Sequence, residues 1–500
     1  MFLLPFQGNP VLAAVYLVLG VAVAALASLY LTTRRPRLNF PIVGDPDATD
    51  CRDALVEGAI LYPDQPWVLP LQDPMVILPH SAVSEIKSLP EKQMSLNKEL
   101  YVRFLGRYTL LGQDDDEMVS VIKHDLYRSL SDVFDNVLVD EAIYGVAASV
   151  GACKDWTPLA PFNVTARIIT MLNGRTFVGL PLSRNEDWIH STIAFTTEGD
   201  IVAQSLRPYP SLIRPVVAPF LPAVRSLKKH QALVSKKTQP LIEAHFARSA
   251  SEKKDPNQSG RLLSWLLGKY KNGTSPNRIA KDYLLSSAAS IPIPASLLTH
   301  ILFELGKRPE YVEPLRLELR AAVEKNGGKF SYNCLGSLDK MDSFIKETQR
   351  LNSHGLIMMT RRTTAKFTMS DGTVIPKDVS VGVSNYGLNM SPTIHENPEE
   401  FRGFRFSDLR QSKPGVGART QFVSTGLDNL NWGYGNHACP GRHFAAAEIK
   451  LTLAYLLSNY DLKLGDDGRP DNMIFGLLVV PNPFAKLLFK RRAPIAGLEL

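Results

Sequence analysis

Cysteine and excess charge are both scarce in this sequence. Four cysteines occur among 500 residues, and the net charge is only +7. The scattered spacing of the cysteines excludes a disulfide framework and a zinc-ligand signature, which points to a reducing compartment. The basic residues are dispersed and form no recognition motif, so we predict no nucleic-acid partner; the small excess suits an anionic membrane surface or an acidic protein. The cysteines are Cys51, Cys153, Cys334 and Cys439.

Charge is also missing from the N-terminal part of the chain. Residues 11–31 carry no charged side chain, and Arg34, Arg35 and Arg37 follow directly. Such a run is long enough to span a bilayer, and basic residues on its C-terminal side favour a cytosolic location for the rest of the chain. A cleaved signal peptide would carry its charges before the apolar run. We therefore predict a signal anchor over residues 1–32, a basic Pro-rich hinge over 33–46 and a cytosolic catalytic domain over 47–500.

The stretch WGYGNHACPGRHFA, from Trp432 to Ala445, concentrates the chemistry of the chain. Its cysteine, Cys439, ends a Gly-rich loop, and the residues from Arg442 onward have helical periodicity. A helix N-terminus and free loop N–H groups favour an anion, which here would be the thiolate of Cys439. Glycines let a loop backbone pass close to a flat, bulky partner. A thiolate held in this way suits an axial haem ligand, although a lone cysteine can also be a small buried hydrophobe.

The pattern aromatic-Gly-x-Gly-x-His-x-Cys-x-Gly, continued by Arg442 and Phe444, closely resembles the cysteine loop of the cytochrome P450 haem-thiolate monooxygenases. The resemblance implies a mainly α fold with small β-sheets (α+β) and haem b (iron protoporphyrin IX) held by Cys439. It also implies O2 as co-substrate, NADPH-cytochrome P450 reductase as electron donor with cytochrome b5 as an additional candidate, and a single-pass location in the endoplasmic reticulum membrane. The segments LTHILFELGKRPEYVEPLR and TMSDGTVIPKD resemble those of the filamentous-fungal microsomal branch, which oxidises lipophilic secondary metabolites.

Several further residues are expected at the haem by the same resemblance. The segment Glu117 to Ala142 reads as a helix whose basic side chains would bind haem propionates, although a solvated charged face explains them equally well. One arginine of the pair Arg361–Arg362, which we expect to begin a strand, should reach a propionate, and Arg362 is preferred. The predicted cofactor contacts besides Cys439 are Lys123, Arg128, Arg362, Trp432 and His437.

A second motif of the family is formed by two separate segments. Glu347 and Arg350 stand three residues apart on one face of an expected helix, and Arg405 follows in the segment PEEFRGFRF. A carboxylate between two guanidinium groups makes strong charge-assisted hydrogen bonds. The resemblance assigns these residues a structural role behind the haem.

The central helix departs from the family pattern. Thr274 or Ser275 followed by Pro276 should start a helix that runs to Gly306 and passes over the haem. Where the family has an acid or other polar residue followed by threonine, this chain has Ile291-Pro-Ile-Pro-Ala-Ser296, which cannot relay protons in the same way and should kink the helix. Ser290 and Ser296 are the nearest hydroxyls and our candidate catalytic groups. The prolines either widen the pocket or alter the chemistry, and the sequence leaves both alternatives open.

The substrate pocket should be built from two other regions. Residues 187–250 are helical in pattern but are interrupted by five prolines between Pro208 and Pro222, which excludes one straight helix. The resemblance assigns this region to a lid that touches the membrane, and an ordinary surface connection is the alternative. Strands are expected near Trp67 and Met75, a hairpin at Asp371-Gly372, and a C-terminal hairpin at Phe475 to Val480 whose tip enters the pocket.

These observations predict a monooxygenase that oxidises a terpenoid, polyketide or alkaloid. The first rival is a haem-thiolate enzyme that rearranges, cyclises or desaturates its substrate without inserting oxygen, as the loss of the threonine position implies. The second rival is a non-catalytic haem-binding membrane protein, which would leave the substrate-channel region unexplained.

Overall fold

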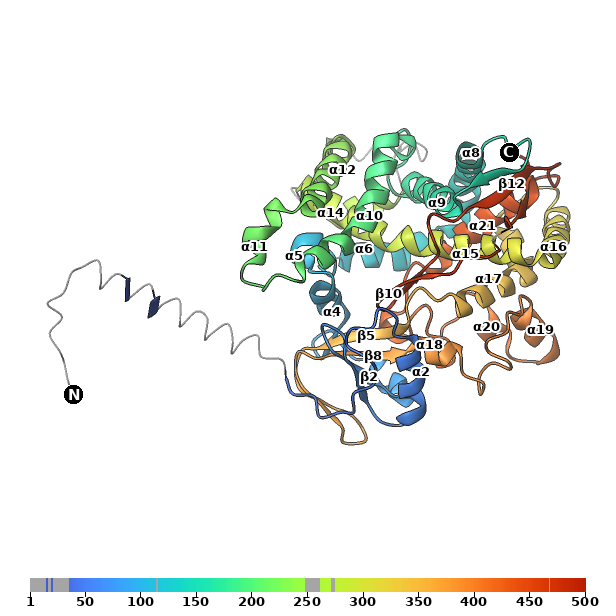
Figure 1. Ribbon diagram of the computed structural model, residues 1–500. Helices are drawn as coiled ribbons and strands as arrows, with labels where there is room; N and C mark the ends of the chain where they lie inside the picture. Colours follow the sequence, from blue (N-terminus) through green and yellow to red (C-terminus); the bar gives the residue numbers. More distant parts are fainter. Residues whose placement is uncertain are drawn as a thin grey trace, which may run out of the picture.

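The computed structural model describes residues 15–16, 19–20, 36–113, 116–247, 261–270, 275–466 and 468–500. Helices make up most of the body, and the strands β2, β5 and β8 lie together with helix α2 at one end of it (Figure 1). This arrangement confirms the predicted mainly α fold with small sheets. The predicted membrane anchor lies outside the described residues except for 15–16 and 19–20, which are helical.

The largest sheet has five strands in the order β1-β2-β8-β5-β3. Only β2 and β8 are parallel, and the other pairs are antiparallel. The end of the predicted hinge joins this sheet, because Val43 N donates to Val68 O at 3.0 Å and Val68 N to Pro41 O at 2.7 Å. The five strands are Trp67–Leu69 (β1), Met75–Leu78 (β2), Met94–Ser95 (β3), Ile357–Thr363 (β5) and Ser380–Ser384 (β8).

The three smaller sheets include both predicted hairpins. Phe367–Thr368 (β6) pairs with Val374–Ile375 (β7), and Gly372 in the turn has φ +86°, a conformation that glycine adopts readily. Met473–Phe475 (β10) pairs with Leu478–Val480 (β11) as the C-terminal hairpin. The third sheet has the order β4-β12-β9, with strands Thr157–Leu159 (β4), Tyr460–Lys463 (β9) and Leu487–Arg491 (β12).

The core of the body is formed by helices that are buried on most sides. Within the described chain, one helical stretch, Asn277–Lys307, is long and apolar enough to cross a membrane, but 72% of its most apolar window is buried inside the protein. Its burial identifies it as a core helix. The other core helices are Val139–Val150 (α8), Pro161–Phe177 (α9), Asp339–Leu351 (α17) and Arg442–Asn459 (α21).

The prolines divide the central helix in two. Helix α14 (Pro276–Ser290) begins with Ser275 as N-cap, whose side chain accepts from Arg278 N, and helix α15 (Pro292–Lys307) begins after Ile291. The break is short, because Ile291 N still donates to Ser287 O and Ala295 N to Ile291 O, both at 3.1 Å. The predicted kink is therefore a one-residue interruption.

The lid region is interrupted as predicted. Helix α10 (Glu186–Leu206) and helix α12 (Pro222–Ala247) flank two short turns, α11 (Arg214–Val217) and Ala218–Phe220. Helix α11 lies at the outer edge of the body (Figure 1). Four large apolar side chains are exposed here, with Val216 at 68% and Phe220 at 72% beside Leu212 and Ile213.

The predicted helix from Glu117 to Ala142 is present but irregular. It consists of α6 (Asp116–Ser120), a π-helical segment (Val121–Leu126), α7 (Leu130–Val133), a second π-helical segment (Phe134–Leu138) and the start of α8. Such π-helical segments occur often at functional sites. The remaining helices are Arg52–Leu61 (α2), Val83–Ile86 (α3), Leu96–Arg103 (α4), Gly106–Thr109 (α5), Arg261–Lys269 (α13), Val312–Lys325 (α16), Asn385–Asn389 (α18), Arg405–Ser412 (α19) and Gly417–Thr420 (α20).

Candidate functional site

Cys439 lies in the loop that precedes α21. Its N–H donates to Trp432 O at 2.7 Å, which closes the loop upon itself. Burial raises the pKa of the Cys439 thiol, while hydrogen bonds from the backbone N–H groups of Gly441 and Arg442 and the charge of Arg442 lower it. The sulfur therefore receives two N–H donors at the start of a helix. This donor set suits a sulfur that carries negative charge as a metal ligand, because the bound cation opposes the effect of burial.

Gly435, four residues before Cys439, is required by the packing of the protein itself. Gly435 has φ +78°, and a Cβ atom on it would lie 2.1 Å from Lys87 O. Asn436 N donates to the same carbonyl at 2.9 Å, so the two backbone segments are in direct contact. Sequence reasoning attributed the loop glycines to a close approach by a bulky partner. For Gly435 the structure shows a reason within the protein, the backbone of Lys87, and the close approach of a cofactor to the loop stays a prediction.

The aromatic residue that opens the loop is buried against the protein. Trp432 is 7% exposed, and its indole Nε1 donates to Phe422 O at 2.8 Å. The Phe422 and Trp432 rings meet edge to face, with centroids 5.2 Å apart. The only polar atom of the indole is therefore used within the protein, and any contact of Trp432 with a cofactor is one of packing.

Three basic side chains from different elements converge near the cysteine loop. Burial lowers the pKa of His437, the positive charges of Arg361 and Lys123 lower it further, and Glu91 opposes them. His437 Nε2 lies 3.4 Å from Glu91 Oε1. Lys123 belongs to the first π-helical segment and is exposed, whereas Arg361 belongs to β5 and is 3% exposed. A single carboxylate thus faces three basic groups, which leaves a net positive site.

The two arginines of β5 have different partners because neighbouring residues of a strand point to opposite faces of the sheet. Arg362 pairs with Asp73, lies 3.2 Å from Glu99 Oε2 and donates to Asp378 O at 3.0 Å. Within the described chain Arg361 donates only to Thr360 O, at 2.7 Å, and burial lowers its pKa to about 10. The contacts thus favour Arg361 over Arg362 as the group for an acidic ligand. The strand also starts at Ile357, so the expectation that these arginines begin it was wrong.

Arg128 follows the first π-helical segment. It is exposed between the first π-helical segment and α7, and no contact in the described part of the chain joins it to His437. The adjacent Tyr127 packs against His443 of α21, with ring centroids 5.0 Å apart, and the expected contact of Arg128 with a propionate stays a prediction.

Glu347, Arg350 and Arg405 are brought together in the core. Arg350 donates to both oxygens of Glu347, at 2.8 and 2.9 Å, and Arg405 Nε donates to Oε1 at 3.1 Å. The N–H of Arg402 adds a fourth hydrogen bond at 3.0 Å. Burial would raise the pKa of Glu347, but these hydrogen bonds and charges lower it. The guanidinium groups also donate to backbone carbonyls of residues 389–400, so the network fixes the segment that leads toward the cysteine loop.

The two candidate hydroxyls flank the break in the central helix. Ser290 is the last residue of α14, and its Oγ is buried without a hydrogen-bond partner. Ser296 lies in the first turns of α15 and is 4% exposed. The nearby Thr299 hydroxyl donates to Ala295 O at 2.8 Å and also bonds the Thr165 hydroxyl, so it is already occupied. An unpartnered hydroxyl beside two prolines marks Ser290 as a place for a polar ligand or water.

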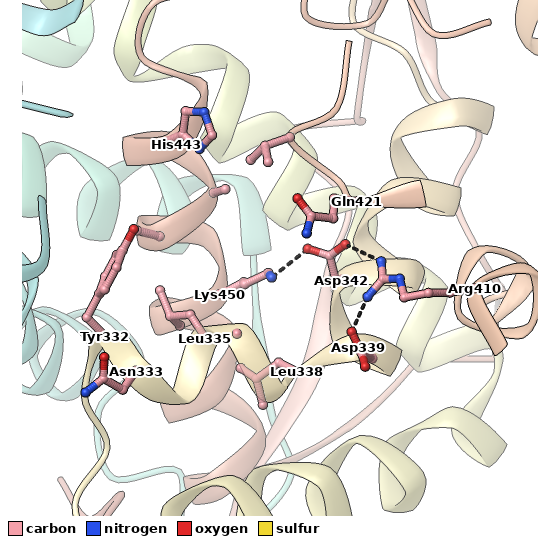
Figure 2. A pocket seen from close by; sticks show the side chains of 14 residues that line it. Tyr332, Asn333, Leu335, Leu338, Asp339, Asp342, Arg410, Gln421, His443 and Lys450 are labelled. Atoms are coloured by element: carbon pink, nitrogen blue, oxygen red, sulfur yellow. Dashed lines mark hydrogen bonds and ion pairs between the residues drawn. The ribbon is translucent and has the colours of Figure 1, made fainter. Parts of the chain in front are cut away.

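A cleft of about 340 Å³ lies against α21, one to three turns after Cys439. Asp342 lies between Lys450, 2.6 Å away, and Arg410, whose Nη2 is 3.4 Å away, and the two basic side chains reach it from opposite sides (Figure 2). Sequence reasoning missed this cleft, because its walls come from segments far apart in the chain. The helical spacing of His443, Ala447 and Lys450 was the only signal for it.

Comparisons with known proteins agree with this geometry. A family model described as "Cytochrome P450" matches residues 153–489. The chain is 36% identical to cytochrome P450 monooxygenase ataF of Aspergillus terreus, over 93% of this chain and 94% of that protein. It is also 36% identical to cytochrome P450 monooxygenase gliF of Aspergillus fumigatus, over 91% and 92% of the two chains. The solved structure of the retinoic acid-bound cyanobacterial CYP120A1 has the same fold, with a TM-score of 0.65 at 16% identity over 91% of this chain and 99% of that one.

Proposed function

The chain belongs to the cytochrome P450 family and is a haem-dependent monooxygenase, and on this premise we propose that it oxidises a lipophilic secondary metabolite at the endoplasmic reticulum membrane. The convergence of the Cys439 sulfur, with its two N–H donors, and the basic group of Arg361, His437 and Lys123 carries the proposal. Similarity to fungal monooxygenases such as ascG of Acremonium egyptiacum, at 34% identity, supports the reaction class.

The residues of the site fit haem b. Cys439 would be the iron ligand, and Arg361, His437 and Lys123 would bind the propionates, since Arg361 is a buried cation with no acidic partner at hydrogen-bond distance in the described chain. Trp432 would pack beside the macrocycle. When bound, a haem with a thiolate ligand activates O2 for insertion of one oxygen atom into the substrate. Glu347, Arg350 and Arg405 would hold the backbone behind the site.

Proton supply is the step for which this chain departs from the family pattern. Pro292, Ile293 and Pro294 offer neither a side-chain hydroxyl nor an acid, and the two prolines lack N–H groups. We assign the proton-holding groups on this helix to Ser290 Oγ and Ser296 Oγ. The unpartnered state of Ser290 Oγ supports its part in this assignment, because a buried hydroxyl without a partner is costly unless a ligand or water satisfies it.

Substrate entry and electron supply would use opposite faces. The exposed apolar side chains of residues 212–220 suit contact with lipid, beside an anchor over residues 1–32, and would admit a lipophilic substrate from the membrane. The cleft against α21 would suit NADPH-cytochrome P450 reductase, with the exposed Lys123 and Arg128 as further basic groups, and cytochrome b5 is a second candidate donor.

The proposal is tested first by spectroscopy and then by product analysis. Reduced protein under carbon monoxide should show the red-shifted Soret band of a thiolate ligand, and Cys439→Ser should lose that band. Deleting the gene in the producing strain should cause a precursor to accumulate that lacks one oxygen atom relative to the missing product. A wild-type protein without the thiolate band would refute the assignment of Cys439.

The break at Ile291 favours one alternative, a reaction without oxygen insertion. A missing proton donor weakens O–O cleavage, so rearrangement, cyclisation or desaturation would suit the altered helix. Precursor and product would then share a formula or differ by two hydrogens only. A non-catalytic haem protein would show the thiolate band but would cause no precursor to accumulate.

A further inference from the structure

A buried polar cluster that the proposed mechanism does not use lies beside α15. Its centre is Arg469, in the segment between β9 and β10, with a side chain only 13% exposed. Arg469 Nε donates to Glu304 Oε1 at 2.7 Å, and Nη2 donates to Asn352 Oδ1 at 2.9 Å and to Asn472 Oδ1 at 3.2 Å. Nη2 also lies 3.5 Å from His300 Nδ1.

These partners belong to three different elements. His300 and Glu304 are on α15, Asn352 is the C-cap of α17, and Asn472 is the residue before β10. Asn472 Nδ2 also donates to Asn352 Oδ1 at 2.8 Å. One planar guanidinium therefore joins the helix that crosses the site to the base of the C-terminal hairpin. Lysine has no such fork and would not reach all of these acceptors at once.

The hairpin has further attachments, and these lead away from α15. Gly476 N at its tip donates to Thr49 O at 3.1 Å. Its strands β10 and β11 have three residues each, and Phe475 near the tip is 49% exposed. Residues 354–356 hold the β11 side, through Val479 N to His354 O and Leu356 N to Leu477 O, both 2.9 Å. In Figure 1, β10 lies between the helical region and the sheet that contains β5. Arg469 links α15 to the base of the hairpin.

Two buried histidines, His300 and His354, lie near the Arg469 cluster. Arginine can only donate, so His300 Nδ1 is the acceptor, and the neutral ring carries its proton on Nε2. His300 Nε2 and His354 Nδ1 are both buried without a hydrogen-bond partner. Burial, Arg469 and His354 lower the pKa of His300, and Glu304 and Arg469 are the other charged groups beside it, so the ring is neutral.

We infer that Arg469 is a positioning residue that fixes the β10–β11 hairpin relative to α15 and thereby selects how a substrate is oriented at the haem. The inference rests on the proposed function, because it takes the hairpin to line the substrate pocket. Arg469 itself touches neither substrate nor cofactor in this role. It acts through His300 and Glu304 on one side and Asn472 on the other.

The test compares Arg469→Lys with Arg316→Lys in the haem-loaded protein. Arg316 is a matched control, since it is 9% exposed and donates to Leu457 O at 3.0 Å, Tyr460 O at 2.9 Å and Asp461 Oδ1 at 2.7 Å, all away from the hairpin. Binding of imidazole and of 4-phenylimidazole is measured by the shift of the Soret band. The affinity of imidazole depends mainly on its bond to the iron, whereas the affinity of 4-phenylimidazole also depends on the shape of the pocket wall.

We expect Arg469→Lys to change the ratio of the two affinities by about tenfold, the effect of roughly one lost charge-assisted hydrogen bond, whereas Arg316→Lys leaves the ratio unchanged. Hydrogen exchange of residues 470–480 should rise in the first variant only, a readout that does not depend on the haem. If Arg469→Lys does not fold, Asn472→Ala replaces it, with the same expectations.

Three outcomes overturn the inference. They are an unchanged affinity ratio, an equal change in both arginine variants, and unchanged exchange of residues 470–480. Absence of the thiolate band in the wild-type protein instead contradicts the proposed function, so the two failures are distinguishable.

Discussion

Replacement of Glu347 by glutamine tests how much the buried network behind the site stabilises the fold. The Glu347 side chain has no exposed surface and accepts four hydrogen bonds, three from guanidinium groups and one from Arg402 N. The variant keeps the shape but leaves two buried cations without their carboxylate. Breaking a buried ion pair by removing one partner costs about 3–5 kcal/mol.

The expected change in the thermal midpoint follows from the size of the chain. At about 2.1 cal/mol/K per residue, a protein of 500 residues has an unfolding entropy of about 1 kcal/mol/K, so a loss of about 4 kcal/mol lowers the midpoint by about 4 °C. Calorimetry at constant scan rate measures this shift, and the ratio of haem absorbance to protein absorbance measures cofactor retention. We expect both values to fall in Glu347→Gln.

Glu313→Gln is the matched control. Glu313 also pairs with two arginines, at 2.9 and 3.9 Å, but its side chain is 54% exposed. Exposed pairs contribute about 0–1 kcal/mol, so we expect a midpoint shift of about 1 °C or less. Equal shifts in the two variants would show that burial does not set the strength of the Glu347 network, and would refute the reasoning.

Four other substitutions test separate parts of the structure. Arg361→Leu should lower haem retention without lowering the urea midpoint of the apoprotein, whereas Arg362→Leu, which breaks buried contacts, should lower that midpoint; the opposite result would return the propionate role to Arg362. Burial lowers the pKa of His354 to about 4, so the unfolded chain takes up the proton first and the unfolding free energy should fall between pH 6.5 and 4 by up to roughly 3 kcal/mol. His354→Gln should flatten this dependence in urea titrations, and a slope that is the same in both proteins would contradict the assignment. Gly435→Ala should lower the thermal midpoint and the haem content, because its Cβ would meet Lys87 O; a variant that matches wild type would show that the loop adapts.

The sequence predicted well what depends on local pattern. The cysteine loop and the start of α14 at Ser275 follow from glycine, proline and capping preferences. The interrupted lid follows from the prolines between residues 208 and 222, and the hairpin at Asp371-Gly372 from the turn chemistry of its two central residues.

The sequence did not predict the direction in which individual side chains point or the contacts between distant residues. Arg361 and Arg362 are neighbours of the same type, and only the pairing of β5 with β8 decides which of them meets Asp73. The Arg469 cluster joins residues more than 100 positions apart, and no spacing rule connects His300 with Asn472. No sequence pattern predicted the π-helical segments around Lys123 either.

The break at Ile291 has a mechanical consequence for the whole molecule. Helix α14 packs against the lid helices α10 and α12, whereas α15 packs against the core helices α9 and α17. Pro292 and Pro294 lack N–H groups, so two backbone hydrogen bonds that would join the two halves are absent. The two halves of the central helix therefore have different neighbours and are joined by fewer backbone hydrogen bonds than an unbroken helix would have.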